Sequence, residues 1–374
     1  MKNFKKLNRT ISGLRLTFTG AIPQIFAFLL IGAMTGCRNE YYSIDDFSKI
    51  AKYDTHVHFE GTNTGLAEQA KEDGFCMIAI SVDLGTQPDI YKQFQFGLQQ
   101  EKEFPSQVKN ITSFDLLEWN APDWDKKVIE HLQQDFDAGA LGLKIWKCIG
   151  MTYRDSNDQL IMIDNPRFDA IMDFVVSKNK VVIGHLGEPR NCWLPIDSMT
   201  VISDQNYFKE HPQYHMYLHP EFPSYEEQIA ARDRFLERNP ELTFIGAHLG
   251  SLEWSTDELA KTLDKFPNMA VDMAERICHW QHQSLTDREK VRNFIIKYQD
   301  RLIYGTDLYE GQETKTDEVK AHAHDIWIRD WQYFVTDDEM TAPQVKGKFR
   351  GLKLPREVIV KIYNENARKW FKII

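Results

Sequence analysis

The sequence predicts an α/β fold, a (β/α)8 barrel, and three observations lead to that class. Eight short, β-rich apolar segments recur between residues 51 and 309, and several are near-continuous apolar runs, as in strands buried on both faces. Amphipathic helical stretches lie between them, which is typical of βα units and a parallel sheet. Histidines and an aspartate close several of the segments. Side chains at such strand ends meet at the carboxyl-terminal mouth of a closed barrel.

The first 36 residues predict an export signal. Five Lys and Arg residues lie within the first 15 positions, and an apolar stretch over 21–34 leads to M-T-G-C, which ends at Cys37. A basic region, an apolar region and small residues before a cleavage point define such a signal. The context of Cys37 resembles the lipobox of bacterial lipoproteins, in which the signal is removed and the thiol is lipidated, for example with palmitate. A retained anchor or an ordinary secretory signal is the alternative, although the apolar stretch is shorter than the roughly 20 residues of a spanning helix.

These features predict three parts of the chain and a location. The parts are a signal peptide over 1–36, a polar tether over 37–50, and one barrel over 51–374. Barrels of this length often form a single domain. We therefore expect a membrane-anchored lipoprotein of the bacterial cell envelope, attached through Cys37.

The balance of charged residues limits the classes of molecule that we expect this protein to bind. Of the 45 basic residues, five lie in the signal, so the mature chain carries 40 of them against 55 acidic residues and a formal charge of −15. An acidic surface disfavours nucleic acid and anionic lipid, so the expected partners are a small-molecule substrate and, through the lipid alone, a membrane. The sequence leaves open a homo-oligomer. The other four cysteines, at 76, 148, 192 and 278, could pair in an exported protein. Their spacings form no C-x-x-C motif, and we expect free, buried thiols.

The predicted elements follow one another in barrel order. Proline ends one helix at Asn239-Pro240 and opens another at Pro355, because proline disfavours helix before it and suits a first helical position. Two connections, 189–241 after strand five and 310–351 after strand eight, are predicted as long loops that shape or cover a substrate site. The predicted strands are 51–59, 75–83, 108–115, 141–147, 181–188, 242–250, 269–275 and 302–309, and the predicted helices include 124–138, 167–178, 225–238 and 355–371.

Five residues at strand ends point to a metal site. His56 and His58 alternate along one strand, so both side chains point to the same side. His185 and His248 lie in matched contexts, G-H-L-G and A-H-L-G, and Asp307 ends an apolar segment. First-row metals prefer imidazole and carboxylate ligands, and a catalytic site keeps one position open for water. The alternatives are exposed or core histidines and an aspartate that caps a helix.

With these motifs in place, residues 50–374 resemble the amidohydrolase superfamily, and in particular its amidohydrolase-related (amidohydrolase 2) branch of metal-dependent barrel hydrolases and decarboxylases. The sequence Asn366-Ala367-Arg368 is similar to the final helix of that branch. The resemblance implies one divalent ion, with zinc favoured, held by His56, His58, His185 and Asp307. It also implies that His248 polarises the substrate or orients a water.

Four further residues are candidates for substrate binding. Lys144 ends strand four in G-L-K-I-W, where two-metal members of the superfamily have a carbamylated lysine that bridges the metals. A second metal at a carbamylated Lys144 therefore stays open, as do a substrate-binding lysine and one that extends to solvent. Glu188 and Arg190 follow strand five, and Arg276 follows strand seven, where it could clamp a carboxylate or hydroxyl or form a surface ion pair.

The expected activity is metal-dependent hydrolysis of a small-molecule ester, lactone, amide or related bond by a metal-activated water. Asp307 is expected to take the proton of that water, and His248 to stabilise the oxyanion or leaving group. Non-oxidative decarboxylation is the alternative within the family. A lipid-anchored binding protein without turnover is the alternative from another class, and the complete ligand set argues against it.

Overall fold

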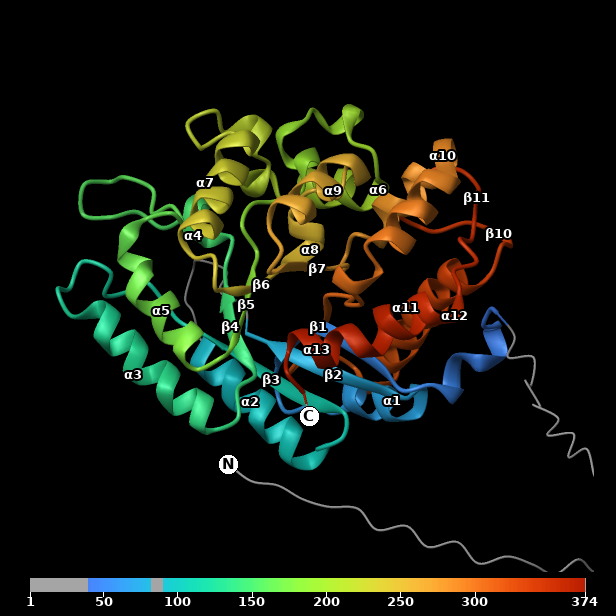
Figure 1. Ribbon diagram of the computed structural model, residues 1–374, viewed down its shortest axis with the longest axis horizontal. Coiled ribbons are helices and arrows are strands. Elements are labelled where there is room, and N and C mark those ends of the chain that lie inside the picture. The colour runs from blue at the N-terminus through green and yellow to red at the C-terminus, as the bar shows by residue number, and fades with distance from the viewer. Residues whose placement is uncertain (1–39, 82–89, 374) are drawn as a thin grey trace, which may run out of the picture. The chain divides into compact units, whose positions relative to one another are not determined.

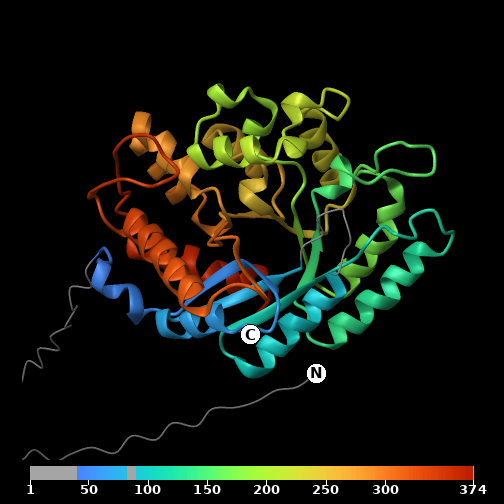
Figure 2. The same cartoon turned by 180° about the vertical axis from the view of Figure 1, so that it is seen from behind.

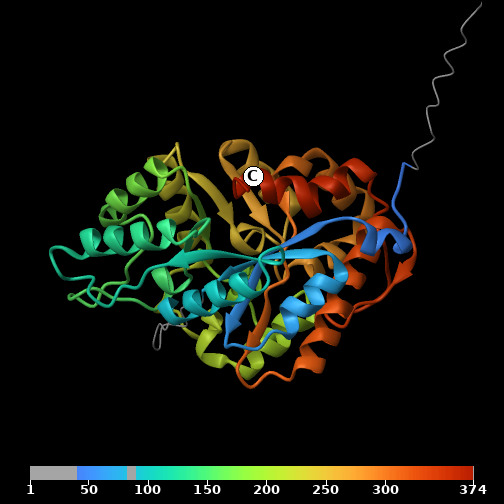
Figure 3. The same ribbon diagram turned by 90° about the horizontal axis from the view of Figure 1, so that it is seen from below.

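Parallel strands form the centre of the fold, and helices surround them (Figures 1 and 3). The computed structural model describes residues 40–81 and 90–373, and these described residues belong to one compact unit. The predicted signal peptide and Cys37 lie outside the described residues. The sheet has the order β8-β7-β6-β5-β4-β3-β2-β1-β9 with parallel neighbours. Its strands are β1 (Lys52–Glu60), β2 (Phe75–Ile80), β3 (Val108–Ser113), β4 (Gly142–Ile145), β5 (Val181–Gly184), β6 (Thr243–Gly246), β7 (Met269–Asp272), β8 (Leu302–Ile303) and β9 (Leu308–Gly311).

The two edges of this sheet belong to one interrupted strand. β8 and β9 are the two halves of the predicted eighth strand, and the segment 304–307 joins them. Within it, the Tyr304 carbonyl accepts a hydrogen bond from Thr55 N at 3.1 Å, and Asp307 N donates to the His56 carbonyl at 2.8 Å, both on β1. On the other side, Glu275 N, just after β7, donates to the Thr306 carbonyl at 3.3 Å. The segment 304–307 therefore forms hydrogen bonds with β1 on one side and with the residue just after β7 on the other. These bonds close the sheet, and the prediction of a barrel is confirmed.

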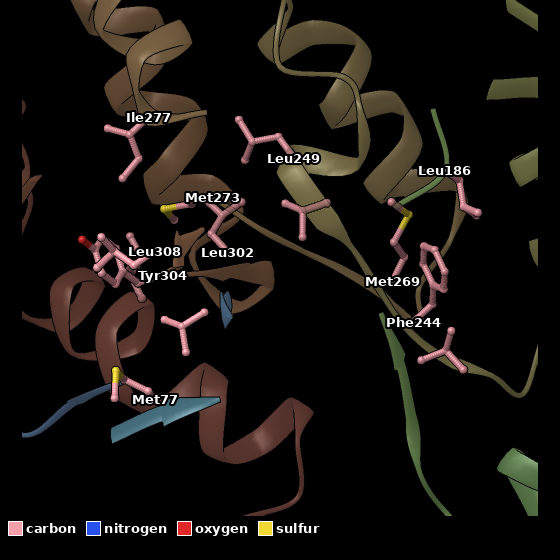
Figure 4. Packing of buried hydrophobic residues seen from close by; sticks show 14 of the residues in the cluster. Met77, Leu186, Phe244, Leu249, Met269, Met273, Ile277, Leu302, Tyr304 and Leu308 are labelled. Atoms are coloured by element: carbon pink, nitrogen blue, oxygen red, sulfur yellow. The ribbon is translucent and has the colours of Figure 1, made fainter. Parts of the chain in front are cut away.

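Alternation along the strands divides the core in two. Val182, Phe244, Met269 and Leu302 cluster with apolar residues of the surrounding helices, and several of them are labelled in Figure 4. The residues that alternate with them cluster separately with Trp370 and Phe371 of the C-terminal segment. Since successive side chains point to opposite faces, this second cluster fills the barrel interior: Ile183, Ile245, Ala270 and Ile303.

Helices connect the strands and cover their outer side (Figure 2). α7 shows how the sequence defines such a helix: Ser224 Oγ accepts from Glu227 N at 3.2 Å and Glu227 Oε2 accepts from Ser224 N at 2.7 Å, a capping box. The α-helices are α1 (Gly65–Asp73), α2 (Ile90–Glu103), α3 (Trp124–Asp137), α4 (Cys148–Met151), α5 (Asp169–Ser177), α6 (Ile202–Glu210), α7 (Tyr225–Arg238), α8 (Ala247–Gly250), α9 (Thr256–Lys265), α10 (Ile277–Lys297), α11 (Thr316–Val335), α12 (Arg356–Val360) and α13 (Asn366–Trp370).

Short helices and one hairpin complete the chain. A two-stranded antiparallel pair is formed by β10 (Glu339–Met340) and β11 (Phe349–Arg350). A π-helix, Lys361–Glu365, joins α12 and α13. The 3-10 helices are Ile44–Lys49, Pro166–Phe168, Arg190–Trp193, Ile196–Ser198, Pro212–Tyr214, Met216–Leu218 and Gln299–Arg301.

The long connection predicted after strand eight is present, but it is partly helical. The segment 310–351 contains α11, which packs against α1 (Figure 2). Five of the eight buried residues of α11 recur at every fourth position and form one apolar stripe that faces the barrel. The segment after strand five does form the predicted long excursion, but it also contains α6 and α7. The residues of the α11 stripe are Val319, Ala323, Trp327, Trp331 and Val335.

No helix of the described residues has the length and apolar character needed to cross a membrane. The thiols of Cys76, Cys192 and Cys278 are free, as the spacing predicted.

Candidate metal centre

Two histidines on β1 and one aspartate after β8 converge inside the barrel mouth. His56 and His58 are buried and alternate with Val57, which faces the helices, so both rings point inward. Asp307 Oδ1 lies 3.2 Å from His56 Nε2 and 2.9 Å from His58 Nε2. One donor atom from each of these three residues lies within 4.8 Å of the others. The structure thus brings together three of the four predicted ligands.

The outer nitrogen of each ring determines what the inner nitrogen can do. His58 Nδ1 lies 2.7 Å from the Ile80 carbonyl, which can only accept, so Nδ1 carries the hydrogen. His56 Nδ1 lies 3.0 Å from the Asp272 carboxylate and donates in the same way. In the neutral rings both Nε2 atoms then present lone pairs to the Asp307 carboxylate. An Nε2 lone pair and a carboxylate oxygen repel each other at these distances unless a proton or a cation lies between them. The three donor atoms therefore fit a metal ion.

A tight turn holds Asp307 in place. Its φ is +71°, and its N–H donates to the His56 carbonyl at 2.8 Å. The preceding residue, Thr306, donates through N at 3.0 Å and through Oγ1 at 2.6 Å to the buried carboxylate of Asp54. Burial opposes ionisation of Asp307, but the neighbouring His56 and His248 outweigh it and hold the pKa of that carboxyl well below its usual range. The Asp307 carboxylate is therefore held as an anion in a fixed position.

Asp272, on β7, is a site residue that the sequence reading missed. It is buried, faces inward two positions after Ala270, and accepts from His56 Nδ1. It also accepts from the backbone N–H groups of His248 at 2.8 Å and Ala274 at 3.1 Å. Asp272 therefore orients one predicted ligand and also the turn that carries His248. The sequence indicates Asp272 only as a carboxylate at a position of an apolar strand whose side chain faces the barrel interior.

His248 lies in a strained turn, α8, with φ of +57°. Its Nδ1 is 2.9 Å from the Ala274 carbonyl and so donates, which leaves a lone pair on Nε2 of the neutral ring. Its ring lies between those of two predicted ligands, with centroids 4.8 Å from His56 and 4.3 Å from His185. Burial holds the pKa of His248 well below its usual value, so the neutral form prevails.

His185 lies beside the three converging ligands rather than among them. It directly follows β5, and its ring contacts that of His248. Its buried Nε2 makes no hydrogen bond and lies 3.7 Å from Glu188 Oε2. Burial lowers the pKa of His185 to about 4, so the ring is neutral. A neutral ring with an unpartnered buried nitrogen fits a role as a further ligand.

Lys144 reaches the same cluster from β4. It is completely buried and faces inward, with Nζ 3.4 Å from His56 Nε2 and 4.9 Å from the Trp146 ring. Burial lowers the pKa of Lys144 to about 8. The alternative in which this side chain extends to solvent is therefore wrong.

A cavity of about 380 Å³ opens onto the cluster. Of the predicted substrate-binding residues, Glu188 and Arg276 line this cavity. Arg190 does not: its guanidinium stacks 4.1 Å from the Trp254 ring. The cavity is lined by Lys147, His185, Glu188, Pro189, Ser203, Asp204, Tyr207, Phe208, His248, Glu275, Arg276 and Asp307.

The two predicted residues in the cavity have charged neighbours that the sequence did not reveal. Glu188 pairs with Lys147, and although burial opposes ionisation, this ammonium holds the pKa of Glu188 well below its usual range. Arg276 is buried, and its Nε makes no hydrogen bond. Burial disfavours its charge, but the carboxylates of Asp204 and Glu253 outweigh burial and raise the pKa of Arg276. The cavity therefore offers a guanidinium with unused hydrogen-bonding capacity.

Comparison with known proteins agrees with this architecture. A family model described as Amidohydrolase matches residues 213–373, and no curated protein matches the chain. Among solved structures, 2,6-dihydroxybenzoate decarboxylase from Rhizobium is 16% identical with a TM-score of 0.50, covering 86% of this chain and 99% of that one. A zinc-bound amidohydrolase from Burkholderia multivorans is 11% identical (TM-score 0.47, 87% and 100% covered). A 4-oxalomesaconate hydratase from Rhodopseudomonas palustris is 10% identical (TM-score 0.46, 86% and 95% covered).

Proposed function

We propose that this chain is a member of the amidohydrolase superfamily and a metal-dependent hydrolase of a small molecule. The observation that carries the proposal is the convergence of His56 Nε2 and His58 Nε2 on Asp307 Oδ1. Their outer nitrogens are tied to Asp272 and to the Ile80 carbonyl, which is how proteins orient metal-ligating histidines.

These three residues would hold one divalent ion, zinc by preference, and His185 would be the fourth ligand. A bound ion of this kind acts as a Lewis acid and makes water a nucleophile near neutral pH. Lys144 lies close enough to the cluster to take part in a second metal site if carbamylated. That arrangement stays the alternative to a single ion.

His248 is proposed as the main proton acceptor of the reaction. The predicted role as a hydrogen-bond donor to an oxyanion needs a hydrogen on Nε2, but the bond from Nδ1 to the Ala274 carbonyl places the hydrogen of the neutral ring on the other nitrogen. A ring with a free Nε2 lone pair on the cavity wall can accept a proton from water. Asp307 orients that water and shares the proton acceptance predicted for it.

Arg276 is proposed to bind an acidic or hydroxylated part of the substrate. Its guanidinium lines the cavity close to His248 and Asp307, and its Nε has no partner. Arginine pairs readily with carboxylates. The same feature supports the alternative of decarboxylation, the reaction named for the Rhizobium structure of similar fold. In that case a carboxylate of the substrate bound by Arg276 would leave as CO2, and a proton would take its place on the substrate carbon.

The test is turnover by the purified mature protein in three states: as purified, stripped by a chelator, and reloaded with zinc. The substrates are panels of lactones, esters, amides, glycosides and aromatic acids. We expect hydrolysis of at least one class that disappears on stripping and returns on reloading. Release of CO2 without hydrolysis would select the decarboxylase, and turnover independent of metal would refute the proposal.

A further inference from the structure

A second cavity, of about 330 Å³, lies beside the first. The two share three lining residues, Lys147, Glu188 and Tyr207, so they are neighbouring parts of one cleft. The further lining residues of the second cavity are Cys148, Met151, Thr152, Gln213, Tyr214, Met216 and Phe222. We name this second cavity the apolar lobe.

The walls of the apolar lobe are formed mainly by apolar side chains, which pack against a buried cluster on the side away from the cavity. Met151 comes from α4, and Met216 from the long segment after β5; both are buried in a small cluster separate from the barrel core. Tyr214 and Phe222 are half-buried and pack against the same cluster. The lobe is therefore a built feature of the fold. Methionine and aromatic side chains together suit an apolar ring, since thioether and ring faces both contact aromatic groups favourably.

A closed ion pair separates the lobe from the metal ligands. Lys147 Nζ bonds Glu188 Oε1 and lies 5.6 Å from the centroid of the Tyr214 ring. The other oxygen of Glu188 lies 3.7 Å from His185 Nε2. A chain of contacts therefore leads from the predicted ligand His185 through Glu188 and Lys147 to Tyr214 in the wall of the lobe. Because Lys147 and Glu188 neutralise each other, the boundary leaves no net charge to repel an apolar group.

We propose that the apolar lobe is the specificity subsite of the active site and holds an apolar ring of the substrate. The polar, reacting end of the same molecule lies in the first cavity, between the metal ligands and Arg276. The substrate class is therefore amphipathic: a polar head linked to a ring that crosses the Lys147–Glu188 pair. This inference rests on the proposed function, because it takes the metal cluster as the reacting end.

The test is calorimetric binding of hydroxamates to the zinc-loaded protein. A hydroxamate chelates zinc, and the series acetohydroxamate, benzohydroxamate, phenylacetohydroxamate, 3-phenylpropanohydroxamate and 4-phenylbutanohydroxamate moves a phenyl ring stepwise away from that anchor. We expect at least one phenyl member to bind about tenfold or more tightly than acetohydroxamate, as for the burial of a phenyl-sized group. The best member reports the spacing between the metal and the lobe.

We call the gain in affinity of the best phenyl hydroxamate over acetohydroxamate the increment. Two variants test whether the increment arises in the apolar lobe. Thr152→Trp places an indole in the lobe from an exposed position and should abolish the increment. Phe222→Ala removes part of a wall and should reduce it. The matched control is Leu218→Trp, which adds the same indole at a residue that is 52% exposed on the same segment and does not line the lobe. Zinc content and melting temperature show that each variant is folded.

Each result has one meaning. An increment that is lost in Thr152→Trp, reduced in Phe222→Ala and kept in Leu218→Trp supports the subsite. Equal affinity across the hydroxamates, or an increment unaffected by both lobe variants, overturns the subsite while the metal site stands. Absence of zinc and of all hydroxamate binding overturns the proposed function and with it the subsite.

Discussion

At the scale of residues, the histidines of the site differ in which partner orients them. His56 is tied to a carboxylate, whereas His58 and His248 are tied to carbonyl groups. A carboxylate partner makes a ligating imidazole more electron-rich than a carbonyl partner does. His248 differs again because its turn has φ of +57° and its ring lies on the cavity wall. Position therefore distinguishes His248 from His56 and His58, whereas the orienting partner does not, because His58 and His248 both donate to a carbonyl group.

Replacement of His248 tests this separation. His248→Asn should keep zinc but lose turnover by about 10² to 10⁴-fold, as for the loss of a proton acceptor. The matched comparison is His56→Ala, which should lose both because it removes one of the few ligands. Metal content and turnover are measured on the same preparations. Loss of metal in the His248 variant to the extent seen for His56 would reassign it as a ligand, and normal turnover would remove it from the mechanism.

A buried carboxylate on α11 predicts a pH dependence of stability. Burial raises the pKa of Asp330 to about 7. The Tyr304 hydroxyl donates a hydrogen bond to Asp330 Oδ2 at 2.9 Å, which lowers the pKa but does not offset burial. An unfolded aspartate titrates near about 3.9, so the folded state binds the proton more tightly. The stabilising contribution is thus complete below about pH 4 and lost as the pH rises to about 7, at up to about 1.4 kcal/mol per pH unit.

Asp330→Asn should lack this contribution. The free energy of unfolding of the variant, measured in denaturant, should therefore improve relative to that of the native protein as the pH rises from about 4 to about 7. The control is Asp325→Asn, at an exposed position of the same helix, whose unfolding free energy should follow the native pH profile. Parallel profiles for native and Asp330→Asn would contradict the prediction.

At the scale of elements, β5 shows how one small residue aims a site residue. Gly184 ends the strand directly before His185, and a Cβ on it would lie 2.5 Å from the buried Phe244 ring of β6. Gly184→Ala should therefore destabilise the fold by about 1–3 kcal/mol through overpacking. Measured by denaturant unfolding, the loss should shrink when Phe244→Leu is added, because the clash is relieved. Strictly additive effects of the two substitutions would contradict this cause.

The elements also show what the sequence could reveal. The starts of β2, β3, β5 and β7 match their predictions, since a run of apolar residues marks a strand buried on both faces. The end of β5 was predicted at 188 but lies at Gly184, because the backbone turns into the cavity at His185. α11 was missed because its apolar stripe is interspersed with charged residues, and only the four-residue spacing indicates it.

The same contrast holds within the site. His56, His58 and Asp307 could be predicted because His56 and His58 lie in a recognisable strand and Asp307 closely follows another. Asp272 and Lys147 could not, because an isolated acid or lysine looks the same in sequence whether it faces the barrel interior, the cavity or solvent. Only the register of each strand and the path of the loop after it place these two groups.

At the scale of the whole molecule, we propose that the barrel is attached to a membrane of the cell envelope through lipid on Cys37. This residue lies outside the described part of the chain, and the proposal rests on the sequence before it. Cys37→Ser should move the protein from the membrane fraction to the soluble fraction after cell fractionation. A variant that stays with the membrane after a carbonate wash would contradict lipid attachment.

The metal content of the purified protein tests the whole proposal most directly. Elemental mass spectrometry should find close to one divalent ion, zinc by preference, per native chain, and far less in His58→Ala and in Asp307→Ala. The exposed variant Asp257→Ala is the control and should keep its metal. A content near two, with added mass on Lys144, would instead select the two-metal arrangement. Native protein that holds no metal, even after metal is supplied, would contradict the assignment of His56, His58 and Asp307 as a metal centre.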